Sequence, residues 1–486
     1  MSGLHLPRVI AFGYSAGMSE ESPLPHASLP RVLGFVTASA IVVGEVIGSG
    51  IFFKPAEVAR AANGQVGIIL TLWVVCGLVS LCGALTLAEL SAMFPHAGGT
   101  YVFLREAYGR TWAFLWCWAE FWVIRTGAIA ALAVYSCISL ESLTRDAGLV
   151  LSEEGWSVFR RGAAISMIGG LGVINILATH WGGHVQTAMT VIKIAFVALL
   201  AVLPFIALGE GSDVRNVWWP DQMQATAWLG IGSALGAIMW TYDGWGNVTV
   251  IAEEIHHPER NLPRALIGGV LLLIALYFGA NLAYHLTLPA EEIGREMIPS
   301  YAVCEKLMPG YGGKVMVAML LISLFGALSG NILVGPRVLY AVARDYTWLK
   351  PFRHVNVRTR TPARAIAAVC AWAMVLVLLP DVHTGDRPTN LADWLTSYCI
   401  FGGSIFYLSA VLAVFVLRRR RPDAVRPYRA WGYPITPAIF VLFYIFLLGT
   451  LFYARPRECL WGLSLIAAGL VVYLVMSRFT NPNKAG

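Results

Sequence analysis

The sequence has few charged residues for its length. Asp, Glu, Lys and Arg make up 13% of its 486 residues, and hydrophobic residues make up 57%. Soluble domains carry roughly a quarter charged residues, so this composition excludes an ordinary soluble protein and predicts a membrane protein with several spans. The net charge of +7 could suggest nucleic-acid binding, but the basic residues cluster in a few loops between apolar runs, as membrane topology requires. We therefore expect a lipid bilayer, and no nucleic acid, as partner.

The sequence also lacks the motifs of metal sites, disulfide frameworks and membrane enzymes. Its eight cysteines are scattered, mostly inside apolar runs, and form no C-x-x-C pair. The ten histidines form no H-E-x-x-H motif, and no G-x-S-x-G or Walker loop occurs. We expect no catalytic residue, no metal and no cofactor, and thus no enzyme. The first 30 residues lack the ordered parts of a signal peptide and predict a cytosolic tail.

Apolar runs long enough to cross a bilayer recur along the chain. A crossing helix needs about 20 apolar residues, and on that measure the sequence predicts twelve spans in an all-α integral membrane protein. The spans cover residues 31–60, 66–94, 110–141, 161–180, 184–209, 225–255, 263–288, 313–343, 364–380, 391–417, 434–454 and 457–477.

Charge in the loops predicts how these spans are oriented. The connections after the eighth and the tenth span carry six basic residues each, which predicts that both face the cytoplasm. Loops 210–224 and 291–306 carry more acidic than basic residues and are expected outside. An even number of spans then places both termini in the cytoplasm, the second as a tail over residues 479–486. Residues 98–109 are too short and polar to cross, and predict a short amphipathic helix along the cytoplasmic interface.

The first span contains a segment that should interrupt its helix. Gly48 and Gly50 flank Ser49 inside the apolar run, and glycine costs roughly 1 kcal/mol relative to alanine in a helix interior. Non-helical backbone at membrane depth must be buried by protein or line a cavity, so an opening here implies a cavity. The free N–H groups of a half-helix starting near Ile51 would make a carboxylate site there, comprising Gly48, Ser49, Gly50 and Ile51. The alternative is that Gly44 and Gly48 only form a close-packing face between two spans.

A second pair of glycines, Gly244 and Gly246, lies in the sixth span. Gly48 and Gly244 are 196 residues apart, and each lies in the first span of a five-span set, which is typical of transporters with inverted repeats and a midplane site. Free carbonyl groups at the second break suit an ammonium group, so the two breaks together would bind the two charged groups of an α-amino acid. Its amino group and side chain are assigned to Trp240, Tyr242, Asp243 and Gly244, with Trp240 as a gate over the cavity.

Several charged residues are predicted inside the membrane. Lys193 lies well within the fifth span, where a charge costs about 3 kcal/mol and must point into the protein. It could replace a coupling sodium ion, change protonation during the cycle, or belong to an internal ion pair. Glu45 and Asp243 lie within one turn of a break, and either could pair internally, bind a cationic substrate side chain or carry a proton. Arg125 needs a partner that the sequence does not name, and Glu89 is expected to cap a helix or pair with a loop.

A set of segments along the chain resembles one family. They are Gly48-Ser49-Gly50-Ile51-Phe52, Ala88-Glu89-Leu90, the stretch from Pro95 to Gly109, Gly244-Trp245, Glu253-Glu254-Ile255, Pro258-Glu259-Arg260-Asn261-Leu262-Pro263 and Phe325-Gly326-x-x-x-Gly330. Together they resemble the L-type amino acid transporter (LAT) family of the amino acid, polyamine and organocation (APC) superfamily, over about residues 31–430. The resemblance implies the LeuT-like fold of two inverted five-span repeats plus two further spans, and a permease or antiporter that moves L-amino acids by alternating access.

The resemblance also implies roles for single residues. Lys193 matches the family's span-five lysine, which occupies a sodium-site position, so transport would be sodium-independent exchange or proton-linked. Trp240 falls at the family's aromatic gate position. Glu45 and Asp243 stand where small residues are usual, which bears on the range of substrates.

The predicted organisation is a first repeat over residues 31–209, a second over residues 225–418 and two further spans over residues 434–478. Animal members attach to a glycoprotein through a cysteine between the third and fourth spans, and residues 142–160 contain none. We therefore expect no disulfide-linked heavy chain, and a prokaryotic plasma (inner) membrane. The alternatives are a sodium-coupled transporter of the same fold, which Lys193 disfavours, and a transport-inactive amino acid sensor, which a sizeable cytosolic tail would mark.

Overall fold

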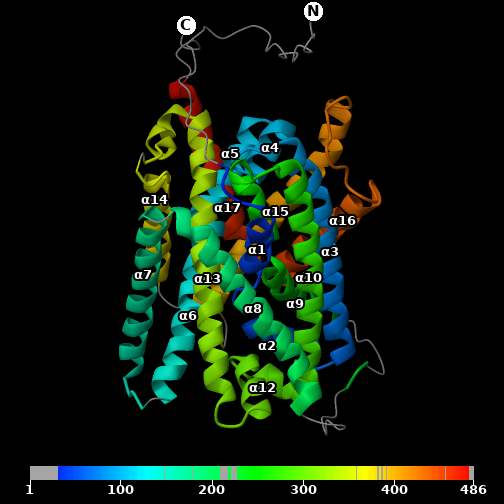
Figure 1. The fold of residues 1–486 in the computed structure, drawn as a ribbon, viewed down its shortest axis with the longest axis vertical. Helices are drawn as coiled ribbons and strands as arrows, with labels where there is room; N and C mark the ends of the chain where they lie inside the picture. The colour runs from blue at the N-terminus through cyan, green and yellow to red at the C-terminus, as the bar shows by residue number, and fades with distance from the viewer. Residues whose placement is uncertain are drawn as a thin grey trace, which may run out of the picture.

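The computed structural model describes residues 31–146, 148–177, 179–207, 217–219, 227–356, 358–379, 382–384, 387–389, 391–454 and 456–480. Long helices run side by side along the long axis of the molecule (Figure 1). The helices are α1 (Phe35–Val46), α2 (Gly50–Ala61), α3 (Val66–Met93), α4 (Thr100–Tyr108), α5 (Arg110–Ala119), η1 (Glu120–Ile124), α6 (Arg125–Asp146), α7 (Glu153–Leu177), α8 (Thr179–Ala207), α9 (Ala227–Tyr242), η2 (Trp245–Glu254), α10 (Pro258–Thr287), α11 (Ala290–Arg295), α12 (Pro299–Leu307), α13 (Gly312–Asp345), η3 (Thr347–Arg353), α14 (Ala363–Val377), α15 (Leu391–Arg420), α16 (Ile435–Ala454) and α17 (Pro456–Thr480). Strands β1 (Val382–Thr384) and β2 (Arg387–Thr389) pair as a short antiparallel hairpin.

The helices account for all of the predicted spans. Among the described residues, ten helical segments are long and apolar enough to cross a membrane, with α1 and α2 counted as one and α5, η1 and α6 as another. The shorter α14 and the pair α9 and η2 occupy the positions of the ninth and sixth spans. The prediction of an all-α, multi-pass membrane fold is confirmed. The boundaries of the two repeats stay a prediction.

Both interruptions lie where glycine makes them easiest. In the first span, α1 ends at Val46 and α2 begins at Gly50. In the sixth, α9 ends at Tyr242, and η2 begins after Gly244, whose φ of +110° lies in the left-handed region that favours glycine. The prediction that spans one and six are broken is confirmed.

One end of the molecule, here called the basic end, carries α4 and the arginine-rich connection between α15 and α16. Arg421 of this connection pairs with Glu106 of α4 at 2.8 Å. Glu89 near the end of α3 is buried and pairs with Arg418 at 2.6 Å, and the backbone N–H of Ala430 donates to the same carboxylate at 2.8 Å. The expected loop-pairing role of Glu89 is confirmed. Helix α12 lies at the opposite end (Figure 1).

The short helix expected over residues 98–109 is present as α4, but most of its side chains are buried. Tyr101 and Arg105 donate hydrogen bonds of 2.6 and 2.7 Å to Asp345 at the end of α13. Its position along the membrane interface stays a prediction. Its charged residues serve contacts with other helices, and a sequence pattern cannot distinguish these contacts from exposure to water.

Candidate substrate site

A cavity of about 40 Å³ lies between the two helix breaks. Of the predicted site residues, it brings together Glu45, Gly48, Ser49, Gly50, Trp240, Asp243 and Gly244. Residues of α6, η2 and α13 also line the cavity. At roughly 10–15 Å³ for each water, this space holds about three water molecules. Binding of an amino acid therefore requires the cavity to widen.

The first break leaves an open helix N-terminus beside this cavity. The N–H groups of Phe52 and Phe53 donate to the carbonyl of Ser49 at 3.1 Å each. Within the described part of the chain, the N–H groups of Ser49, Gly50 and Ile51 make no backbone hydrogen bond. Unpaired N–H groups at the positive end of a helix dipole suit a carboxylate. Ile51 offers only its backbone, since its side chain is fully buried and lies outside the cavity lining.

The glycines of the first break differ in what surrounds them. A Cβ atom on Gly50 would lie 2.5–2.7 Å from Thr241, whose backbone Cα is among the atoms met. A Cβ on Gly48 would make only ordinary contacts of 3.5 Å. A Cβ on Gly44 would lie 2.2 Å from the hydroxyl of Thr190. The close-packing alternative therefore holds for Gly44, where α1 meets α8, and Gly50 is one position where the two broken spans pack closely.

Lys193 projects from α8 onto the end of α1. Its buried Nζ atom donates to the carbonyls of Gly44 and Ile47, both at 2.9 Å. The hydroxyl of Ser323 on α13 donates to the same Ile47 carbonyl at 3.0 Å. Carbonyls at the end of an unwound half-helix are the groups that hold sodium in transporters of this architecture. Among the described residues, Lys193 forms no ion pair within 4 Å, so the internal ion pair considered for it with Glu45 is not formed.

A buried chain of hydrogen bonds joins Glu45 to Arg125. The side-chain amide of Asn247 donates to Glu45 Oε2 at 3.1 Å, and Arg125 Nη2 donates to Asn247 Oδ1 at 2.9 Å. Arg125 also pairs with Glu120 at 2.6 Å and donates to Asn331 Oδ1 at 2.7 Å. Glu120, Asn247 and Asn331 are therefore the partners that the buried Arg125 needs. Asn247 and Asn331 line the cavity as well, so the network forms part of its wall.

Sequence reasoning missed Glu120, which stands five residues before Arg125. In an α-helix the residues that share a face are three or four apart. Segment η1 is a π-helix, and its i→i+5 geometry brings Glu120 and Arg125 to the same face. The hydroxyl of Thr126 bonds the carbonyl of Phe121, which repeats the five-residue step. The three- or four-residue spacing of an α-helix therefore does not predict that Glu120 and Arg125 pair.

The remaining acidic groups leave the site with an excess of negative charge. The carboxylate of Asp243 lies near Tyr407 of α15. Glu45 Oε1 is buried without a hydrogen-bond partner among the described residues. With Glu120, the site holds three carboxylates against Arg125 and Lys193, so one negative charge is unbalanced if all are ionised.

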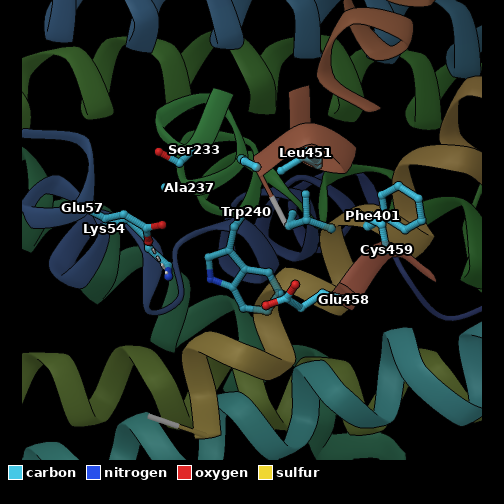
Figure 2. Close-up of a pocket in the computed structure, with 12 residues that line it drawn as sticks. Lys54, Glu57, Ser233, Ala237, Trp240, Phe401, Leu451, Glu458 and Cys459 are labelled. Carbon is cyan, nitrogen blue, oxygen red and sulfur yellow. Dashed lines mark hydrogen bonds and ion pairs between the residues drawn. The ribbon is translucent and has the colours of Figure 1, made fainter. Parts of the chain in front are cut away.

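Trp240 closes the cavity on one side. Its indole Nε1 donates to Ser49 Oγ at 3.3 Å, which links the two breaks. Trp240 also lines a second cavity (Figure 2), so its side chain borders both spaces. Its role as a gate stays a prediction.

Tyr242 does not reach the site. Its side chain is buried, and its ring centroid lies 5.1 Å from that of Tyr277 and 6.1 Å from that of Trp73. Tyr242 is not among the residues that line the cavity, and its assignment to the substrate stays a prediction. Two residues along a helix turn the side chain by about 200°, so Tyr242 faces away from the cavity that Trp240 covers.

Comparison with known proteins gives one consistent result. The model of the family described as amino acid permease matches residues 33–476, a range that contains both breaks. The serine/threonine exchanger SteT of Bacillus subtilis (strain 168) is 32% identical over 469 residues, which cover 93% of this chain and 98% of that protein. The human b(0,+)-type amino acid transporter 1 is 29% identical over 458 residues, covering 93% and 89%. The human large neutral amino acids transporter small subunit 2 is 28% identical over 453 residues, covering 92% and 81%.

Proposed function

The chain belongs to the amino acid permease family and is a secondary amino acid transporter, and from this premise we propose that it moves L-amino acids by sodium-independent exchange or proton-linked transport. We place the substrate in the cavity between the two breaks. One observation carries this proposal. Ser49 and Gly50, whose N–H groups make no backbone hydrogen bond among the described residues, line the cavity together with Asp243. An α-amino acid carries the two complementary charges.

In this proposal, the substrate carboxylate binds the N–H groups of Ser49, Gly50 and Ile51, next to Gly48. Its ammonium group binds near Asp243 and Gly244 at the second break. The cavity is too small for this in its present form, so Trp240 must move as substrate enters. The hydrogen bond between Trp240 and Ser49 supports such coupling, because it joins the gate residue to a residue whose backbone N–H would bind the substrate carboxylate.

Sodium independence follows from Lys193 in this proposal. Its ammonium group already occupies the carbonyls of Gly44 and Ile47, with Ser323 beside them. A sodium ion would have to displace a covalently attached cation. The excess carboxylate at Glu45 or Asp243 is then either neutralised by a proton or balanced by a cationic substrate, since two close carboxylates resist joint ionisation.

The setting in the membrane is part of the same proposal. The basic end faces the cytoplasm, which puts both termini there and fits a plasma (inner) membrane. No disulfide-linked heavy chain is needed, because the connection between α6 and α7 carries no cysteine.

Uptake into proteoliposomes tests the function. Labelled amino acids of small neutral, large neutral, cationic and acidic classes are offered with and without internal amino acid, with sodium or choline, and with or without a pH gradient. We expect uptake of at least one class, stimulated by internal amino acid or by an inward proton gradient, and equal in sodium and choline. Sodium-stimulated uptake would contradict the role of Lys193. Binding without uptake under every condition would favour the amino acid sensor.

A further inference from the structure

The connection between α15 and α16 concentrates arginine at the basic end of the molecule. Six arginines lie between the last turn of α15 and Ala430, and these are Arg418, Arg419, Arg420, Arg421, Arg426 and Arg429. The carboxylates that lie on this connection or pair with it are Asp423, Glu89 and Glu106. Three positive charges are therefore unbalanced, and the transport proposed above uses none of them.

The buried carboxylate of Glu89 holds this connection in a fixed shape. It pairs with Arg418 at 2.6 Å, accepts the backbone N–H of Ala430 at 2.8 Å and lies 3.3 Å from Nε of Arg426. The guanidinium group of Arg426 also donates to the carbonyl of Arg421 at 2.8 Å, so the chain folds around it. Two of the six arginines thus serve as internal ties of the connection.

Other arginines of the connection face outward. Arg419 and Arg429 are exposed, and within the described part of the chain their guanidinium groups form no ion pair and no hydrogen bond. Arg420 is exposed as well and donates to the carbonyl of Ala107 at 2.8 Å, a contact that leaves its charge unbalanced. The excess positive charge therefore lies at the surface of an ordered connection.

Apolar surface follows these arginines directly along the chain. Trp431, two residues after Arg429, has a side chain that is 70% exposed. Helix α16 then exposes apolar side chains at helical spacing along one face, and these are Ile435, Ile439, Leu442 and Phe446. Helix α16 lies at the edge of the bundle (Figure 1), so this face contacts the acyl chains of the bilayer. Tryptophan is typical of the boundary between acyl chains and headgroups.

We propose that this surface binds the headgroup of an anionic phospholipid. The phosphate contacts Arg419 and Arg429, Trp431 packs at the level of the glycerol, and the acyl chains lie along α16. A free phosphate or an acidic peptide would match the arginines and leave the apolar face unused, whereas a phospholipid matches both. The inference requires only that the chain lies in a bilayer, and it does not depend on the substrate transported.

Arginines that serve only to orient the protein in the membrane make a different prediction. They act through diffuse attraction to the membrane surface, which depends on the number of charges and not on their position. The connection between α13 and α14 provides the comparison, because it too lies at the basic end and exposes Lys350 and Arg358, which form no ion pair among the described residues. Its tryptophan, Trp348, packs against Phe114 with ring centroids 5.6 Å apart, so this connection lacks the exposed indole.

The test is a double variant, Arg419→Gln with Arg429→Gln, of the full chain in neutral detergent. Phosphatidylglycerol or the neutral phosphatidylcholine is titrated into the purified protein, and native mass spectrometry counts the bound lipid. We expect the wild type to bind phosphatidylglycerol saturably and more tightly than phosphatidylcholine. The Kd for phosphatidylglycerol should rise about fivefold for each arginine and about thirtyfold for both. The matched control, Lys350→Gln with Arg358→Gln, loses the same charge and should keep the Kd of the wild type.

A third variant, Trp431→Ala, tests the apolar part of the surface without changing its charge and should also raise the Kd for phosphatidylglycerol. Thermal unfolding without added lipid checks that each variant is folded, and the single arginine variants replace the double one if it is not. Equal losses in the two double variants, or a loss in neither, would overturn the site. Wild-type protein that binds phosphatidylcholine as tightly, or from which soluble glycerol phosphate displaces the lipid at equal concentration, would overturn it too.

Discussion

Replacing Lys193 by alanine should convert a built-in cation into a site for a free one. The ammonium group holds two carbonyls at 2.9 Å each. Without it, the Ile47 carbonyl keeps the hydroxyl of Ser323 at 3.0 Å, and the Gly44 carbonyl keeps no partner among the described hydrogen bonds. The truncation also leaves space for a small cation between these oxygens.

The magnitude follows from these contacts. One buried carbonyl left unsatisfied costs about 1–3 kcal/mol. Loss of the positive charge also raises the unbalanced negative charge of the site from one to two, which disfavours the variant further unless a proton or cation enters. Sodium can satisfy both oxygens, and binding at ten times its Kd would restore about 1.4 kcal/mol.

Thermal unfolding of the purified protein in detergent provides the assay. Wild type, Lys193→Ala and Ser323→Ala are compared in sodium chloride and in choline chloride of equal ionic strength. We expect Lys193→Ala to unfold at a lower temperature than the wild type in choline and to recover part of the difference in sodium. Ser323→Ala, which keeps the ammonium group, should respond to neither salt.

Two results would refute this reasoning. A Lys193→Ala protein as stable as the wild type in choline would mean that the ammonium group does not hold the end of α1. Wild-type uptake that rises with sodium would mean that the ion has a site which Lys193 leaves open.

The glycines and carboxylates of the site give further predictions. Gly50→Ala should lose substrate binding and destabilise the protein by about 1–3 kcal/mol, because the added methyl group meets the backbone of α9. Gly48→Ala should fold and bind substrate, because its methyl group makes only ordinary contacts. Substrate titration during thermal unfolding compares the two variants, and equal behaviour would contradict these contacts. Asp243→Asn should change coupling or selectivity more than stability. If a proton balances the negative charge of the site, uptake of a neutral amino acid should rise as external pH falls in the wild type and not in the variant. If a cationic substrate balances that charge, lysine or arginine should compete for uptake in the wild type and not in the variant. A Glu45→Gln, Asp243→Asn double variant with the pH profile and substrate ranking of the wild type would show that both carboxylates are structural.

The membrane class, the spans and the positions of both breaks could be predicted from the amino-acid sequence. These features depend on local properties. A run of about 20 apolar residues is long enough to cross a bilayer in any context, and paired glycines weaken a helix wherever they occur. The burial of Lys193 followed in the same way, since a charge in the middle of an apolar span has to face protein.

Which side chains contact one another depends on how the helices pack. Lys193 had Glu45 as an evident partner in sequence, yet it binds carbonyls that become available only because α1 ends beside α8. Glu120 pairs with Arg125 because a π-helix shifts the register of one turn, and nothing in the residue types marks that shift. Tyr242 turns away from the cavity because helix geometry, and not proximity in sequence to Asp243, sets the direction of a side chain. Contacts between distant segments depend on how whole helices pack, which no single segment encodes.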